Sequence, residues 1–246
     1  MSIAVARLTS EVRLFPPGHV LAGAQVKLQN VVPSSEPADD FQFGVRRYFV
    51  RNEPIFKTGT SASHVYRVVS GTVRMCRYVE KRRFVLDFAF PSELVGFTNR
   101  PRHNFDAEAV SDCTLIAYPR AQLDAAMITT PSIGSNILSQ MTDNATNAQQ
   151  HLLSIACQDA KQRVAAFLVR ILDRNGVQEN EALYLPMKRR DIADHLALCT
   201  ETTCRVLRSL KVANIIDIPN THEIVVKDLA GLRALGCLNG GANGHA

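Results

Sequence analysis

The chain has 246 residues, of which 46% are hydrophobic and 21% charged, and its 28 Lys and Arg against 23 Asp and Glu give a net charge of +5. This composition excludes a mainly disordered chain, and the length allows one large packed domain or two smaller ones. No run of 18 apolar residues occurs, and the N-terminus lacks an apolar segment with a cleavage site, so we expect a cytoplasmic protein without a transmembrane helix, membrane partner or signal peptide. The six cysteines are then expected to be thiols, metal ligands or redox groups rather than disulfides. The net charge is compatible with nucleic-acid binding but does not require it.

Residues 1–42 lack any sustained hydrophobic periodicity. Pro16, Pro17, Pro33 and Pro37 are accompanied by serines and by acidic residues. Such a composition predicts a flexible N-terminal arm. A short arm that packs on the following domain is the alternative.

Residues 43–130 are punctuated by Gly, Pro, Ser and Asn between short β-prone runs. This spacing predicts a small antiparallel barrel or sandwich, a scaffold that binds a ligand or transmits a signal. The expected strands are residues 45–50, 54–56, 64–69, 73–79, 84–90 and 113–117.

A long helix is predicted over residues 131–157. It begins at Pro131, a residue favoured in the first helical turn. One narrow apolar seam recurs in steps of three and four residues, while the other faces are mostly polar. A narrow seam indicates a dimerisation helix, although a core helix that packs on its own barrel has the same period. The seam consists of Ile133, Ile137, Met141, Ala145, Ala148, Leu152 and Ile155.

The last module, residues 158–236, combines helices with a hairpin, and residues 237–246 form a Gly-rich tail that we expect to be flexible. An amphipathic helix over 160–172 precedes two short helices over 189–196 and 200–212. A hairpin of strands 215–218 and 223–226 follows, and then a short helix over 228–235. The two short helices have the apolar skeleton of a helix-turn-helix, which the hairpin makes winged. This skeleton consists of Ile192, Ala193, Leu196, Val206, Leu207 and Leu210, with Ala197 and Leu198 in the turn.

Polar residues of the second short helix share the side opposite its apolar residues. In a helix-turn-helix this side enters the major groove, where Arg can bind guanine and Glu can accept a hydrogen bond from cytosine. The alternative is an ordinary helical pair whose charges are only solvated. The predicted base-reading residues are Thr200, Glu201, Cys204 and Arg205, and the predicted phosphate contacts are Lys188, Arg189, Arg190, Cys199, Thr202, Arg208 and Lys211.

The segment LPMKRRDIADHLALCTETTCRVLRSL, preceded by a β-rich domain and a long helix, resembles the cyclic-AMP receptor protein/FNR superfamily of transcription regulators, in particular its FixK-like subgroup. The resemblance implies an α+β fold with an N-terminal antiparallel β-roll like that of cyclic-nucleotide-binding domains, a long dimerisation helix and a C-terminal winged helix-turn-helix. It also implies a homodimer that binds TTGA-type palindromes in double-stranded DNA. Members of this subgroup usually activate genes of low-oxygen respiration, denitrification or nitrogen fixation. If this chain is an activator, RNA polymerase is a further partner.

Four positions depart from the family pattern. Ala197 replaces the turn glycine, Cys199 replaces the threonine that caps the recognition helix, Cys204 replaces a serine, and Lys188 replaces a capping Ser or Thr. Cys199 is a poorer cap, so Thr200 is expected to take over part of its role. We expect these changes to weaken or retune the site preference. Cys199 and Cys204 are also candidates for oxidation. The alternative is that both are only small packing or contact residues.

The sequence does not favour a cofactor or a bound metal. Phe105 and Asp106 lie where the cyclic-nucleotide binders of the family place an Arg and a hydroxyl, and no cysteine precedes Cys76 for an iron–sulfur cluster. A haem or another ligand in the β-domain stays open as an alternative, as does a regulatory module that does not bind DNA. The chain has no P-loop, Rossmann fingerprint, HExxH motif or nucleophile elbow, so we do not expect an enzyme. The expected control is through the amount of protein made.

Overall fold

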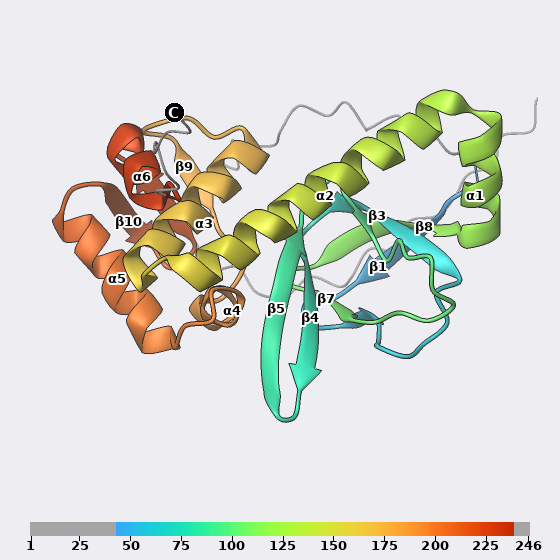
Figure 1. Cartoon of the computed structure of the whole chain (residues 1–246), viewed down its shortest axis with the longest axis horizontal. Helices are drawn as coiled ribbons and strands as arrows, with labels where there is room; N and C mark the ends of the chain where they lie inside the picture. The colour runs from blue at the N-terminus through green and yellow to red at the C-terminus, as the bar shows by residue number, and fades with distance from the viewer. Residues whose placement is uncertain (1–42, 239–246) are drawn as a thin grey trace, which may run out of the picture. The chain divides into compact units, whose positions relative to one another are not determined.

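The computed structural model describes residues 43–238 (Figure 1). The predicted N-terminal arm and most of the predicted tail lie outside these residues. Residues 45–119 form two four-stranded antiparallel sheets with the orders β1-β8-β3-β6 and β2-β7-β4-β5. Their strands are β1 (Val45–Phe49), β2 (Pro54–Phe56), β3 (His64–Ser70), β4 (Val73–Val79), β5 (Arg82–Ala89), β6 (Leu94–Val95), β7 (Asp106–Ala109) and β8 (Cys113–Pro119).

The two sheets enclose one apolar core. Val68 and Leu115 of the first sheet and Val73 and Ala107 of the second are fully buried in the same cluster. Between β3 and β4 the chain turns at Gly71, whose φ of 85° is in the left-handed region. A Cβ at this position would lie 2.4 Å from the carbonyl oxygen of Asp112, so only glycine fits the turn. The predicted β-roll is confirmed.

Helix α2 (Pro131–Cys157) has the predicted bounds and follows α1 (Arg120–Thr129), which sequence analysis did not predict. The N-terminal part of α2 packs on its own β-roll. Ile133 and Ile137 are buried in a cluster with Tyr118 and Leu123. Their apolar surface is therefore already covered within the chain, and assigning these two residues to a dimer seam was wrong.

The C-terminal part contains α3 (Ala160–Asn175), β9 (Ala182–Tyr184), α4 (Arg189–His195), α5 (Thr200–Val212), β10 (Ile216–Asn220), β11 (Glu223–Val226) and α6 (Leu229–Gly236). Helix α3 begins at a capping box, in which Asp159 accepts from the backbone N–H of Gln162 and the Gln162 side chain accepts from that of Asp159. It ends at the left-handed Gly176. Strand β9, which was not predicted, extends the wing to a three-stranded sheet in the order β10-β11-β9.

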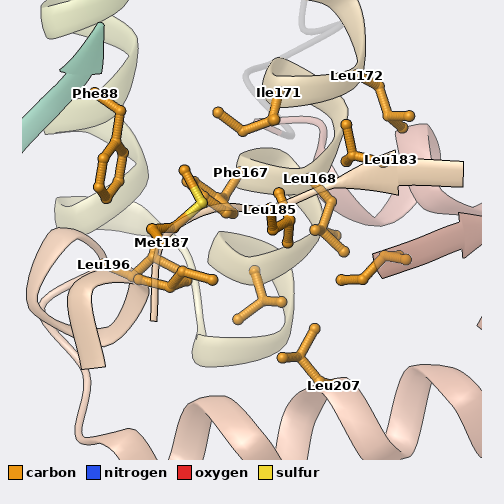
Figure 2. Close-up of a cluster of buried hydrophobic side chains, with 14 of the residues drawn as sticks. Phe88, Phe167, Leu168, Ile171, Leu172, Leu183, Leu185, Met187, Leu196 and Leu207 are labelled. Atoms are coloured by element: carbon orange, nitrogen blue, oxygen red, sulfur yellow. The ribbon is translucent and has the colours of Figure 1, made fainter. Parts of the chain in front are cut away.

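The β-roll and the C-terminal part share one hydrophobic cluster (Figure 2). Phe88 of β5 lies in the same cluster as Phe167 of α3, Met187 and Leu196. The rings of Phe88 and Phe167 are 6.3 Å apart in an edge-to-face arrangement, which is a favourable geometry for aromatic pairs. Burial of apolar surface therefore stabilises the packing of the helix-turn-helix on the β-roll. None of the helices within residues 43–238 is both long enough and apolar enough to cross a membrane.

Candidate nucleic-acid interface

Helices α4 and α5 form the predicted helix-turn-helix. The first buries Ile192 and Ala193, and the second buries Val206, Leu207 and Leu210. Their apolar sides meet because residues three and four apart lie on one face of a helix. In the turn, the backbone N–H of Leu198 donates to the carbonyl of Ala193 at 2.9 Å. This core fixes the direction in which α5 leaves the turn.

Ala197 occupies the turn in a left-handed conformation, with a φ of 54°. The family has glycine here, so a mild strain is expected of Ala197 if the turn needs a left-handed backbone, and the φ meets that condition. The Cβ of an L-residue in this region costs roughly 1–2 kcal/mol.

We expect Ala197→Gly to raise the free energy of unfolding by about 1 kcal/mol, because relief of the strain outweighs the greater entropy of glycine in the unfolded chain. Urea unfolding of both proteins measures this change. Ala193→Gly, in helix α4, is the matched control and should lower the stability. An unchanged or lower stability of Ala197→Gly would contradict the assignment of strain.

Cys199 is the N-cap of α5. Its Sγ accepts a hydrogen bond from the backbone N–H of Thr202 at 3.4 Å and lies 3.1 Å from the Thr202 hydroxyl. The hydrogen bonds from Thr202 lower the pKa of the exposed Cys199 thiol. The cap thus stays at Cys199, and the expectation that Thr200 would take over part of it was wrong.

The predicted base-reading residues lie together on the exposed side of α5. Thr200, Glu201, Cys204 and Arg205 are all exposed, whereas Thr203 between them is buried. The guanidinium of Arg205 lies 3.5 Å from the hydroxyl of Thr202. On this side, the carboxylate of Glu201 can accept hydrogen bonds from base edges in a major groove, and the guanidinium of Arg205 can donate them.

The predicted phosphate contacts have different surroundings. Lys188, Arg190 and Arg208 are exposed. Arg189 is half-buried, burial lowers its pKa, and its Nη1 has no hydrogen-bond partner among the described residues. Lys211 binds Asp217 of the wing at 2.8 Å and lowers the pKa of that carboxyl group. Lys211 is exposed too but is paired, so Lys188, Arg190 and Arg208 are the cations most freely available to phosphate oxygens.

Four charged residues near this interface were not singled out from the sequence. Arg74 of β4 and Arg83 of β5 form ion pairs with Asp191 and Asp194 of α4. The Asp residues are visible in the motif RRDIADH, but their partners are more than 100 positions away. No local pattern could have identified the pairs.

The β-roll positions that correspond to the cyclic-phosphate contacts of the family have other roles. Phe105 is partly buried and packs against the apolar core, with its ring 5.5 Å from that of Phe56. Asp106 accepts a hydrogen bond from the backbone N–H of Thr58 at 2.6 Å. An apolar ring and a carboxylate replace the donors that would hold a phosphate. Within residues 43–238 no group of three or more His, Cys, Asp or Glu side chains could hold a metal ion.

Comparison with known proteins identifies the family. Family models match a Crp-like helix-turn-helix domain over residues 162–235 and a cyclic nucleotide-binding domain over residues 46–130. The nitrogen fixation regulation protein FixK of Azorhizobium caulinodans is 34% identical over 196 residues, which cover 78% of this chain and 79% of that protein. The chain belongs to the FixK family. It is a DNA-binding transcription regulator of the FixK type, as its winged helix-turn-helix indicates.

Other FixK proteins and solved structures agree. FixK of Rhizobium meliloti is 35% identical over 182 residues, or 74% of this chain and 82% of that protein. The structure of FixK2 from Bradyrhizobium japonicum superposes with a TM-score of 0.74 at 28% identity and covers 79% of this chain and 98% of that one. A CooA mutant of Carboxydothermus hydrogenoformans, at 19% identity and a TM-score of 0.70, covers 79% of this chain and 88% of its own and shares the fold.

Proposed function

We propose that this FixK-type protein is a homodimeric transcription activator that binds TTGA-type palindromes and needs no small-molecule effector. Its targets are genes of low-oxygen respiration, denitrification or nitrogen fixation, and RNA polymerase is its partner at the promoter. The observation that carries the proposal is the exposed pair Glu201 and Arg205 on α5, the second helix of a winged helix-turn-helix. In this motif the N-terminal part of the second helix contacts base edges.

Apolar residues of α2 that are exposed or only partly buried support the dimer. Beyond Ile137, two series repeat every seven residues along the helix. Leu138 and Leu152 are large exposed side chains, at 67% and 68% exposure. A seven-residue repeat with two apolar positions is typical of a two-helix coiled coil. The two series are Leu138, Ala145 and Leu152, and Met141, Ala148 and Ile155.

The β-roll supports activity without an effector. The partly buried ring of Phe105 packs against the core and has no hydrogen-bond donor, and Asp106 accepts from a backbone N–H, so neither side chain can donate to a cyclic phosphate. A carboxylate next to a phosphate is repulsive without a cation. The protein is then active as synthesised and is controlled through its amount.

Binding of purified protein to a TTGA palindrome and to a scrambled duplex, in air and without added ligand, tests the proposal. The expected result is a clear preference for the palindrome at every salt concentration, although both affinities fall with salt. Cyclic AMP, added in a parallel titration, should leave the affinity unchanged. Equal affinity for the two duplexes would contradict base reading, and a requirement for cyclic AMP would contradict activity without an effector.

Oxidation of Cys204 is a further part of the proposal, and Cys199 is the alternative target. Cys204 is exposed on the base-reading side of α5 and lies close enough to Arg189 to influence its pKa. Two equivalents of peroxide, each reduced to water, convert a thiol to a sulfinate. This anion would repel phosphate and compete for Arg189.

Peroxide is therefore expected to weaken DNA binding of the unmodified protein and of Cys199→Ser, but not of Cys204→Ser. Gel-shift titrations before and after treatment measure the change. Equal sensitivity of the protein and Cys204→Ser would instead leave Cys204 as a contact residue only.

A further inference from the structure

A buried carboxylate of the helix-turn-helix is neutralised by the β-roll. Asp191 of α4 is 3% exposed. Its Oδ1 lies 2.6 Å from Nη2 of Arg83 and 3.4 Å from Nη1 of Arg74, and its Oδ2 accepts from the backbone N–H of Lys188. Arg83 also binds Oδ2 of Asp194 through Nε at 2.9 Å and Nη2 at 2.6 Å. Arg83 thus joins two carboxylates of α4 to strand β5.

A second set of ion pairs, with the charges reversed, lies on α3. Arg174 binds both oxygens of Asp87 at 3.2 Å, and its Nη2 lies 2.6 Å from Glu93 and 3.0 Å from the carbonyl of Phe88. The cation now belongs to the helix and the carboxylates belong to the β-roll. At one contact helix α4 supplies the carboxylates, and at the other helix α3 supplies the cation. This arrangement favours a single docking position, because a displacement would bring like charges together.

The ring of His195 in α4 adds a third polar contact between the C-terminal part and the β-roll. Its Nδ1 donates to the carbonyl of Val85 at 3.0 Å, and its Nε2 accepts from Arg170. Burial and the charge of Arg170 hold the pKa of His195 well below its usual value, so the ring is neutral and can make both bonds.

These contacts use side chains other than the base-reading residues. Helix α4 is bound to β4 and β5, while Glu201 and Arg205 of α5 remain exposed. A rotation of the helix-turn-helix against the β-roll would leave Asp191 as a buried charge without its partners, which is strongly unfavourable. The network therefore fixes where α5 points relative to the β-roll and to α2, which packs on it.

We propose that Arg83 is a positioning residue for DNA binding, because its pairs with Asp191 and Asp194 set the spacing and orientation of the two recognition helices of the dimer. This inference rests on the proposed function, in which a homodimer binds a palindrome. A palindrome has half-sites at a fixed separation, so both helices must be placed correctly at once. When the second helix is free to rotate, the effective concentration at the second half-site falls. Binding to a single half-site does not depend on where the second recognition helix lies.

Arg83→Gln tests the inference, with Arg82→Gln as the matched control. Arg82 is the neighbouring residue on β5, is exposed, and stacks on Phe84 instead of pairing with α4. The affinities for a TTGA palindrome, for the palindrome lengthened by one base pair, and for a duplex with a single half-site are measured with each protein. Arg83→Gln is expected to lower the palindrome affinity by about tenfold or more, to reduce the preference for the native spacing, and to leave the half-site affinity within about twofold.

Two further variants keep the test decisive if Arg83→Gln folds poorly. Asp194→Asn removes one pair of Arg83 but leaves the buried contact with Asp191, and it should show the same pattern more weakly. Arg83→Lys, which keeps the charge, should restore part of the palindrome affinity.

Unchanged palindrome affinity of Arg83→Gln and Asp194→Asn would overturn the inference, as would an equal loss for palindrome and half-site. A separate outcome concerns the proposed function. If the unmodified protein does not prefer the palindrome to a scrambled duplex, the proposed function fails and the positioning role fails with it.

Discussion

Replacement of Phe167 by alanine is expected to lower the free energy of unfolding by about 3–5 kcal/mol. Phe167 is 2% exposed, and its ring lies 6.3 Å from that of Phe88 and 5.7 Å from that of His195. It therefore lies where α3, α4 and β5 meet, and its loss leaves a cavity between the β-roll and the helix-turn-helix. The surrounding backbone elements cannot all move to fill such a cavity, so most of the lost contact energy is not regained.

Chemical unfolding of the purified protein measures this effect. Val212→Ala is the matched control, because Val212 is 83% exposed at the end of α5, and it should change the stability by no more than about 0.5 kcal/mol. If Phe167→Ala also stayed within that range, the two parts of the chain would not share a core.

Leu152→Glu is expected to convert the dimer to a monomer. Leu152 is 68% exposed in the single chain and belongs to the seven-residue repeat of α2. Burial of a leucine side chain contributes about 1.5–3 kcal/mol, and the two copies in a dimer double this to about 3–6 kcal/mol. The substitution also places two carboxylates against each other in the seam. Together these effects should raise the dimer dissociation constant at least about 100-fold.

Sedimentation velocity over a range of concentrations reports the oligomeric state. Leu153→Glu is the control, since Leu153 is the adjacent residue, is 50% exposed and lies outside the seam. It should remain dimeric. A dimer that survives Leu152→Glu but dissociates with Leu153→Glu would place the interface on another face of α2.

The helix-turn-helix could be predicted closely from the sequence. Helix α5 has the predicted bounds, Thr200–Val212, and α4 differs by one residue. Local information was sufficient here because the apolar residues follow the helical period and the turn lies between two such patterns. The left-handed conformation of Ala197 could be anticipated only from the resemblance, because the family has glycine at this position of the turn.

Some elements could not be predicted, among them β7 and α1. Strand β7 has the sequence DAEA and buries only its two alanines, a pattern without β-branched or aromatic residues. Helix α1 buries only Leu123, so it shows almost no apolar periodicity. These elements form because their neighbours in space hold them, which a local pattern does not reveal.

The error in the α2 seam has a related cause. The apolar period runs from Ile133 to Ile155 without a break, but the surface that covers it changes along the helix. Ile133 and Ile137 face the β-roll, whereas Leu152 is exposed. Periodicity identifies an apolar face but not what covers it. The ion pairs of Arg83 were beyond prediction because 108 residues separate Arg83 from Asp191.

Base reading by Arg205 predicts different behaviour of two alanine variants on specific and non-specific DNA. The affinities of Arg205→Ala and Arg208→Ala for a TTGA palindrome and for its scrambled version are measured at one salt concentration. Arg205→Ala should lose about 1–3 kcal/mol of binding free energy on the palindrome and little on the scrambled duplex, so that the preference largely disappears. Arg208→Ala, which removes an exposed cation expected at phosphates, should weaken both complexes equally and keep the preference. If Arg205→Ala retained the full preference for the palindrome, Arg205 would not be a base-reading residue.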